Sequence, residues 1–342
     1  MSRHHPRPRV GAWIRAAMVL IRALGPRRPV GTAVTRHDLV LAPGPPDVTG
    51  HLWIPPGAPA PAIVLAAGVT PRGPDDPRVV RLADALTRSG RVVFVPAMEL
   101  PRQRIADADV ERLVRAVLAL HANPAVRGGV TLLGFSFGGS FALLAAADPR
   151  LRDRVNLVAT FGAYGDLAGL IQAATTGVST VGGHARPWSG HERAAAVLKA
   201  RLDGTISAYL GGASPDHHAA LRALLDNDDP DAVADLIACL PAPFPALVER
   251  LSPVRVAGHV HAPIILAHAV DDPTIPPAEL ARLQQAFPDA RTHQVRLFTH
   301  VDFAPTLRQL RQAIADLRES WRFAATVLAA GDAADGVRST GA

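Results

Sequence analysis

The sequence has little cysteine, little lysine and no long uninterrupted apolar run. Cys239 is the only cysteine among 342 residues, so no disulfide can form within the chain. This cysteine usage fits a reducing cytoplasm, where we expect the protein to reside. Cys239 lies among the apolar residues of LIACLPAP, and this setting predicts a buried, unreactive thiol.

Aromatic residues are also scarce, at 5 % of the chain, whereas apolar residues make up 48 % and charged residues 19 %. This balance is typical of a globular protein and excludes a bundle of membrane-spanning helices. The length allows one large domain or two ordinary ones, each with a sizeable core.

Acidic residues are missing from the first 37 positions, which hold eight of the arginines. In the remainder of the chain, 28 basic residues are outnumbered by 30 acidic ones. The net charge of +6 therefore comes from the N-terminal arm and not from the body. A nucleic-acid enzyme needs positive charge on its working face, so we expect no nucleic-acid partner.

Residues 1–34 are predicted to form a basic, amphipathic N-terminal arm. Within VGAWIRAAMVLIRAL (10–24), Arg15 and Arg22 share one stripe of a helix and apolar residues fill the remainder. The uncharged stretch 16–21 is too short to span a bilayer, and no signal-peptide core with a small-residue cleavage site is evident. Two interpretations stay open: the helix docks on the body, or it lies at a membrane surface as a peripheral contact.

After the arm, strand and helix patterns alternate. Continuous apolar runs such as PAIVLAAG (61–68) are typical of strands buried on both faces. The predicted strands are 35–42, 48–55, 61–68, 91–97, 128–135, 155–161, 262–270 and 290–298, and the predicted helices are 77–89, 107–123, 136–147, 277–287 and 303–329. This alternation predicts an α/β fold with a mainly parallel sheet flanked by helices.

The alternation stops between residues 165 and 258. Several helical segments, broken by glycine and proline, occupy this part of the chain. We therefore predict an inserted helical cap at 165–258, a core formed by 35–164 and 259–330, and a disordered tail at 331–342.

The segment LGFSFGGS (133–140) lies between a predicted strand and a predicted helix. Gly134, Ser136 and Gly138 form a G-x-S-x-G pattern in the context that a nucleophile elbow requires. In such an elbow a serine stands on a strained turn, and the glycines allow neighbouring backbone to approach closely. The following helix N-terminus favours developing negative charge.

A serine nucleophile needs a base and an orienting acid. LAHAVDDPTIPP supplies Asp271 and Asp272 after the strand 262–270, and LFTHVDF supplies His300 after the strand 290–298. The order Ser136, Asp272, His300 is the order expected for this architecture. His293, within the last strand, is a weaker alternative base, and His268 is interpreted as a core histidine.

The chain resembles α/β-hydrolase-fold serine hydrolases of the dienelactone hydrolase and carboxylesterase kind. Three segments carry the resemblance: LLGFSFGGSFALLAAADPRL, IILAHAVDDPTIPP and FTHVDF. The resemblance covers about residues 48–330. It implies an acid in a D-x-x-V/I-P pattern, which Asp272 fits, with Asp271 bracing the turn. Some members carry the acid after the preceding sheet strand, where Asp166 stands.

The resemblance also implies an oxyanion hole formed by two backbone N–H groups, those of Phe137 and Val69. Family members often have His-Gly in the second loop, and this chain has Ala67-Gly68-Val69. No cofactor or metal is implied. The His259–His261 and His217–His218 pairs lack further ligands at metal-binding spacing and are interpreted as loops.

These features predict a serine esterase that acts on a small-molecule acyl substrate through an acyl-enzyme. A thioesterase, acyltransferase or peptidase would use the same triad, and a non-catalytic binding protein is the alternative from another class. Apolar cap residues favour an apolar substrate or form the cap's own core, and both interpretations stay open: Leu167, Leu170, Ile171, Leu198, Tyr209, Leu236, Leu240 and Phe244.

Overall fold

The computed structural model describes residues 5–25, 35–70, 72–99, 105–188, 190, 196–197, 199–205, 215–296, 298–299, 302–303 and 310–332. Of the predicted site residues, His300 lies outside these ranges. So do Leu198 and Tyr209, and so does the predicted tail from residue 333 onward.

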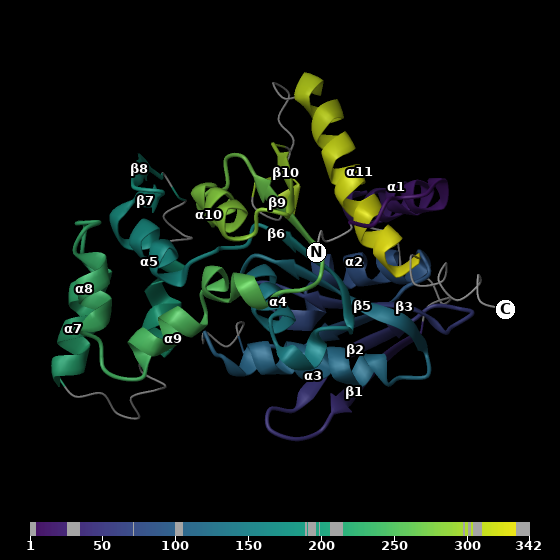
Figure 1. The fold of residues 1–342 in the computed structure, drawn as a ribbon, viewed down its shortest axis with the longest axis horizontal. Helices are drawn as coiled ribbons and strands as arrows, with labels where there is room; N and C mark the ends of the chain where they lie inside the picture. Colours follow the sequence, from purple (N-terminus) through teal and green to yellow (C-terminus); the bar gives the residue numbers. More distant parts are fainter. Residues whose placement is uncertain are drawn as a thin grey trace.

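An eight-stranded sheet runs through the centre of the molecule in the order β1-β2-β4-β3-β5-β6-β9-β10 (Figure 1). β2 pairs antiparallel with β1 and β4, and the six strands from β4 to β10 pair in parallel. The strands are β1 (Thr35–Ala42), β2 (Val48–Ile54), β3 (Ala60–Ala66), β4 (Val92–Pro96), β5 (Val126–Phe135), β6 (Val155–Phe161), β9 (Ile264–Ala269) and β10 (Arg291–Val295). The prediction of a mainly parallel sheet flanked by helices is confirmed.

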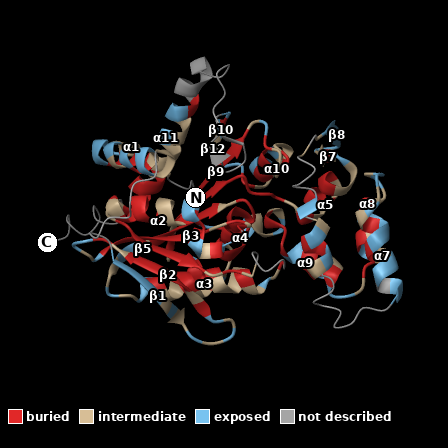
Figure 2. Cartoon of the chain, turned by 180° about the vertical axis from the view of Figure 1, so that it is seen from behind, coloured by how far each residue is buried: buried red, intermediate tan, exposed pale blue. Residues whose placement is uncertain are grey.

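The sheet is buried on both faces because successive residues of its central strands enter two different apolar clusters. In β3, Ala62 and Val64 pack into one cluster, whereas Ile63 and Leu65 pack into the other. This explains why the run is continuously apolar instead of alternating. Figure 2 shows the buried sheet between its helices.

Two sets of helices cover the sheet. Leu113 of α3 (Ala108–His121), Phe141 of α4 (Phe137–Ala146) and Leu280 of α10 (Ala278–Ala286) enter the first cluster. The second cluster takes Val79 of α2 (Pro77–Arg88) together with residues of α1 (Val10–Leu24) and α11 (Leu310–Asp332). Short 3₁₀ turns at Gly73–Asp75, Pro149–Leu151 and Pro253–His259 complete the connections.

Between β6 and β9 the chain leaves the sheet and forms α5 (Leu167–Thr176), α7 (Pro215–Leu225), α8 (Val233–Ala238) and α9 (Phe244–Arg250). A small hairpin, β7 (Val178–Val181) with β8 (His184–Pro187), also occurs here, which the purely helical expectation missed. Gly182 and Gly183 both have positive φ, at 58° and 77°. Two such residues form the tight turn that a two-residue hairpin loop favours.

The end of the chain also differs from the prediction. β10 ends at Val295, three residues before its predicted end, where its partner β9 also ends. The backbone N–H of the next residue, Arg296, donates to the buried Asp316 carboxylate (2.7 Å). A two-residue strand pair, β11 (Phe298–Thr299) with β12 (Asp302–Phe303), follows. The last helix, α11, spans Leu310–Asp332 and so passes the predicted start of the tail, whereas residue 303, its predicted first residue, belongs to β12.

Cys239 was predicted to be buried, and this prediction is wrong because its thiol is exposed. Cys239 directly follows α8, whose inward face is formed by Val233 and Ile237, and the next residue, Leu240, is buried on the same side. At about 100° per residue, position 239 points away from that face. Its apolar neighbours Ile237 and Leu240 are buried, whereas Cys239 itself faces away from them.

Candidate active site

Ser136 occupies the sharp turn between β5, which ends at Phe135, and α4, which begins at Phe137. Its backbone angles are φ 54° and ψ −131°, and it is the only non-glycine residue with positive φ within the described ranges. Its N–H donates to Phe161 O of the neighbouring strand (2.8 Å). Such angles cost on the order of 1–3 kcal/mol and persist only where the surrounding structure enforces them.

The two glycines of the motif are required by close backbone contacts. A Cβ on Gly134 would lie 2.5 Å from Gly139 Cα and clash with Gly138 O. A Cβ on Gly138 would lie 2.7 Å from Ala67 O and clash with Ala66 O. The turn can therefore form only when both positions lack a side chain, as the motif predicts.

The loop after β3 passes directly beside Ser136. A Cβ on Gly68 would lie 2.7 Å from Ser136 Cβ and 3.4 Å from Ser136 Oγ. Val69, the predicted second oxyanion donor, is the next residue of this loop and is half-buried. On the other side, Phe137 is the first residue of α4, and its N–H has no partner within the helix.

Asp272 lies buried in the loop that follows β9. Its Oδ1 accepts hydrogen bonds from the backbone N–H groups of Thr274 (2.8 Å) and Ile275 (3.0 Å). These bonds leave Oδ2 as the atom that faces His268, whose Nε2 lies 3.5 Å away. Asp271, the alternative, is exposed.

His268 lies within β9 and is buried, with Nε2 3.1 Å from Ile275 O. It was interpreted from the sequence as a core histidine, and no sequence signal linked it to the acid. The structure places its imidazole against Asp272 because the two residues stand four positions apart around the end of the strand.

His300 lies outside the described residues. Thr299 of β11, which precedes it in the sequence, pairs with Asp302 of β12. The alternative base, His293, is held by a contact from Nδ1 to Glu319 Oε2 (2.9 Å) and meets the Phe323 ring edge-on. Hydrogen bonds from His293 and Arg322 lower the pKa of Glu319 against the opposing effect of its burial.

The sheet order brings the candidate residues to one edge. β5, β6 and β9 are adjacent and parallel, so the turn at Ser136 and the loop at Asp272 lie at the same carboxyl edge. Two strand spacings correspond to roughly 10 Å. A serine and a carboxylate at this separation require a side chain of histidine's length between them if they are to act together.

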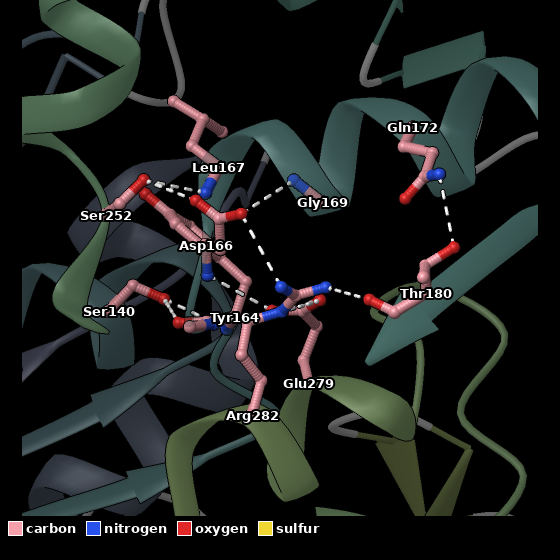
Figure 3. Close-up of polar contacts among 11 residues, drawn as sticks. Ser140, Tyr164, Asp166, Leu167, Gly169, Gln172, Thr180, Ser252, Glu279 and Arg282 are labelled. Carbon is pink, nitrogen blue, oxygen red and sulfur yellow. Dashed lines mark hydrogen bonds and ion pairs between the residues drawn. The ribbon is translucent and has the colours of Figure 1, made fainter. Parts of the chain in front are cut away.

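Asp166, the other alternative acid, caps the N-terminus of α5 (Figure 3). Its Oδ2 accepts from Gly169 N–H (3.2 Å) and lies 3.6 Å from Arg282 Nη1, while its Oδ1 accepts from Ser252 Oγ (3.0 Å). Of these contacts, the one with Arg282 of α10 joins the inserted segment to the core.

Around Asp166 lies a buried polar network that the sequence did not predict. Glu279 Oε2 accepts from the backbone N–H groups of Gly165 (2.8 Å) and Asp166 (3.1 Å), and Arg282 Nε donates to Glu279 Oε1 (3.1 Å) (Figure 3). Burial raises the pKa of Glu279, although the Arg282 charge and the two N–H groups oppose this.

The same junction holds Tyr164, whose hydroxyl donates to Leu251 O (3.0 Å). Burial raises the pKa of this phenol well above its ordinary value, so it acts as a neutral donor. Ser140 Oγ bonds both the N–H and the carbonyl of Tyr164, at 3.0 and 2.9 Å. Through Tyr164, the segment that follows β6 is therefore hydrogen-bonded to α4 and to the turn after α9.

Trp188, just after β8, also reaches the site. Its Nε1 donates to the backbone carbonyl of Asp272 (3.1 Å). A side chain of the inserted segment therefore lies against the loop of the candidate acid, a contact without a sequence signal.

The apolar residues of the inserted segment do not by themselves indicate a substrate pocket. Those that the structure describes are buried in, or packed against, the first apolar cluster: Leu167, Leu170, Ile171, Leu236, Leu240 and Phe244. Within the described ranges, no group of three or more His, Cys, Asp or Glu side chains is placed to hold a metal ion.

No protein-family model and no curated protein sequence matches the chain. Similar solved structures include esterase B from Lactobacillus rhamnosis, at 14 % identity and a TM-score of 0.51, with 92 % of this chain and 93 % of that chain covered. A puromycin-hydrolyzing peptidase from Mycobacterium tuberculosis is 17 % identical with a TM-score of 0.54, covering 89 % of this chain but 40 % of that one. A puromycin hydrolase gives a TM-score of 0.55 at 17 % identity, with 88 % and 40 % covered.

Together with the strand order, these similarities establish that the chain has the α/β-hydrolase fold.

Proposed function

We propose that the protein is a serine hydrolase that cleaves a carboxylic ester through Ser136, His300 and Asp272. The observation that carries the proposal is the conformation of Ser136: a strained, non-glycine residue between a parallel strand and a helix, enclosed by Gly68, Gly134 and Gly138. A structural serine has no need of such backbone strain.

In the proposed reaction, Ser136 Oγ attacks the acyl carbonyl while His300 takes the Ser136 proton. The tetrahedral intermediate collapses when His300 gives that proton to the departing alcohol, and an acyl-enzyme remains. Water, deprotonated by His300, then attacks the acyl carbonyl and releases the carboxylic acid and free Ser136.

The oxyanion of both intermediates would accept hydrogen bonds from the backbone N–H groups of Phe137 and Val69. The position of Phe137 at the N-terminus of α4 supports the first donor, and the approach of Gly68 to Ser136 supports the second.

Asp272 is the proposed acid because of its burial and fixed geometry. Two backbone N–H groups hold Oδ1, so the carboxylate has one defined orientation. Asp271 is exposed, and Asp166 is engaged in capping α5 and in binding Ser252 and Arg282. Thioesters, lactones and small amides are open to the same chemistry, and a peptidase activity is the first alternative, since the puromycin-hydrolyzing peptidase shares the fold.

Hydrolysis of p-nitrophenyl esters with acyl chains from C2 to C12 tests the proposal. We expect the wild type to release p-nitrophenol, and Ser136→Ala to lower kcat/KM by on the order of 10³-fold or more. The acyl chain length that is hydrolysed fastest would indicate how long an acyl group the site accepts. Equal rates for the wild type and Ser136→Ala would overturn the assignment of the nucleophile.

A further inference from the structure

The N-terminal helix α1 docks on the body through its small residues. Ala12, Ala16 and Val19 are buried, and α1 packs against α11 and α2 (Figure 1). Arg15 pairs with Asp332 at the end of α11, and Trp321 Nε1 donates to Trp13 O (2.7 Å). These contacts fix which face of α1 points outward.

The outward face is a stripe of large apolar side chains. Val10, Ile14, Met18 and Ile21 are 75 %, 57 %, 45 % and 70 % exposed. At about 100° per residue they fall within one quadrant, opposite the buried alanines. Helix packing normally buries the larger apolar residues and exposes the smaller ones, and α1 does the reverse.

The stripe continues onto α11. Leu317 and Trp321 are both exposed, at 44 % and 38 %, and the Trp321 ring meets Trp13 edge-on at 4.9 Å between centroids. Of the large hydrophobic side chains that are exposed within the described ranges, only Val40 and Val197 lie elsewhere. Such clustering marks an interaction surface.

The charges around the stripe have one sign. Arg7, Arg9 and Arg22 of α1 and its approach are exposed, as is Arg318 beside Leu317. The acidic side chains of α11 are engaged: Asp332 with Arg15 and Arg91, Glu319 with His293 and Arg322, and Asp316 with the backbone N–H of Arg296. The surface therefore combines exposed apolar side chains, a tryptophan pair and unopposed positive charge.

We infer that this face of α1 and α11 binds the surface of an anionic lipid bilayer, with α1 lying in the plane of the interface. Apolar side chains would enter the acyl boundary, the tryptophans would lie at headgroup level, and the arginines would meet lipid phosphates. No helix among the described residues is long and apolar enough to cross a membrane, so binding would be peripheral. An apolar protein partner would not require the arginines.

Vesicle co-sedimentation of the full-length protein tests the inference. The probes are vesicles of phosphatidylcholine alone and of phosphatidylcholine with phosphatidylglycerol. We expect the wild type to sediment with the anionic vesicles and to be released by high salt. Ile14→Asp/Ile21→Asp should weaken partitioning by at least about tenfold, since each isoleucine loses its burial in lipid.

The matched control is Val40→Asp/Val197→Asp, which places the same two charges on exposed valines that lie elsewhere, one of them in β1, away from α1 (Figure 1). It should sediment like the wild type. Replacing Arg7, Arg9 and Arg22 with Gln should abolish the preference for anionic vesicles. Deleting the arm is a poorer test, because it would uncover the surface that Ala12 and Ala16 bury.

Thermal unfolding of each variant ensures that only folded proteins are compared. Analytical ultracentrifugation tests whether a second copy of the chain binds the stripe instead of lipid. The inference is overturned if the wild type does not sediment, or if the Ile14→Asp/Ile21→Asp variant sediments equally well. It is also overturned if the wild type self-associates through the stripe and does not bind vesicles.

Discussion

At the scale of single residues, the conformation of Ser136 depends on the atoms packed around it. The sequence predicted a strained serine and glycines two positions on either side. The structure shows which atoms leave no room for a Cβ at those glycines. They are the carbonyls of Ala66 and Ala67 at Gly138, and the backbone of Gly139 at Gly134. Gly68 is equally constrained, and it lies outside the five-residue motif.

Gly138→Ala should lower the free energy of unfolding by about 2–3 kcal/mol, because the added Cβ overlaps backbone carbonyls that cannot rotate away. Chemical denaturation measures the change. Gly258→Ala is the control, since a Cβ there meets no atom within 4 Å. Equal midpoints for the two variants would contradict the packing described at the turn.

Asp272→Asn should reduce kcat for ester hydrolysis by on the order of 10³–10⁴-fold, because a neutral amide cannot stabilise the imidazolium that the proposed reaction would form on His300. Asp271→Asn should change kcat less than about twofold, as its side chain is exposed. Steady-state kinetics on one ester compares them. A larger loss of kcat in Asp271→Asn than in Asp272→Asn would contradict the assignment of Asp272 as the acid.

Other single residues could not be predicted. The exposure of Cys239 depends on the phase of a six-residue helix, which its apolar neighbours conceal. The contacts of His268 and Trp188 with Asp272 depend on the path of two loops that the sequence does not encode in a recognisable motif.

At the scale of elements, local sequence signals place helix ends well where a cap is present. Asp76 precedes Pro77, and its Oδ1 accepts from Arg78 N–H (2.9 Å) at the start of α2. A hydrogen bond from the Arg78 side chain, opposed by burial, lowers the pKa of this carboxyl below its ordinary value of 3.8. A carboxyl of this kind stabilises the fold above its unfolded pKa, and the contribution is lost as pH falls through its folded pKa.

Asp76→Ala should therefore lower the free energy of unfolding by about 1 kcal/mol at neutral pH. Asp76→Asn keeps the capping oxygen and should lose only a few tenths of that amount. Denaturation at several pH values should show the difference between wild type and Asp76→Asn shrinking below about pH 4. A difference that grows in acid would contradict the direction of the pKa shift.

Strands buried on both faces were predictable because their apolar runs are continuous, as in β3. The hairpin β7–β8 was not, although Gly182-Gly183 between short β-branched and polar segments is a recognisable hairpin signal. The bond from Arg296 N–H, just past β10, to the Asp316 carboxylate twenty residues away was not predictable either, because no local pattern reveals it.

At the scale of the whole molecule, the inserted segment is joined to the core by charges that lie far apart in the sequence. Arg282 of α10 contacts Glu279, reaches Asp166 at the start of α5 and donates to Thr180 O of β7 (2.5 Å). This junction is not predictable from the sequence, because its members are separated by about a hundred residues and match no motif.

Arg282→Met should lower the free energy of unfolding by about 2 kcal/mol, because it leaves the buried Glu279 carboxylate without its cation. Adding Glu279→Gln should recover part of this loss, since the amide oxygen can still accept from Gly165 and Asp166. A double-mutant cycle in urea measures the coupling. Fully additive losses would show that the two side chains act independently.

The most direct test of the central claim is covalent labelling of the native protein with a fluorophosphonate, followed by mass spectrometry of the peptides. Only a serine activated by its surroundings reacts readily with this probe. The account predicts one labelled residue, Ser136, and no label in Ser136→Ala or in denatured protein. Absence of labelling, or labelling of another serine, would contradict it.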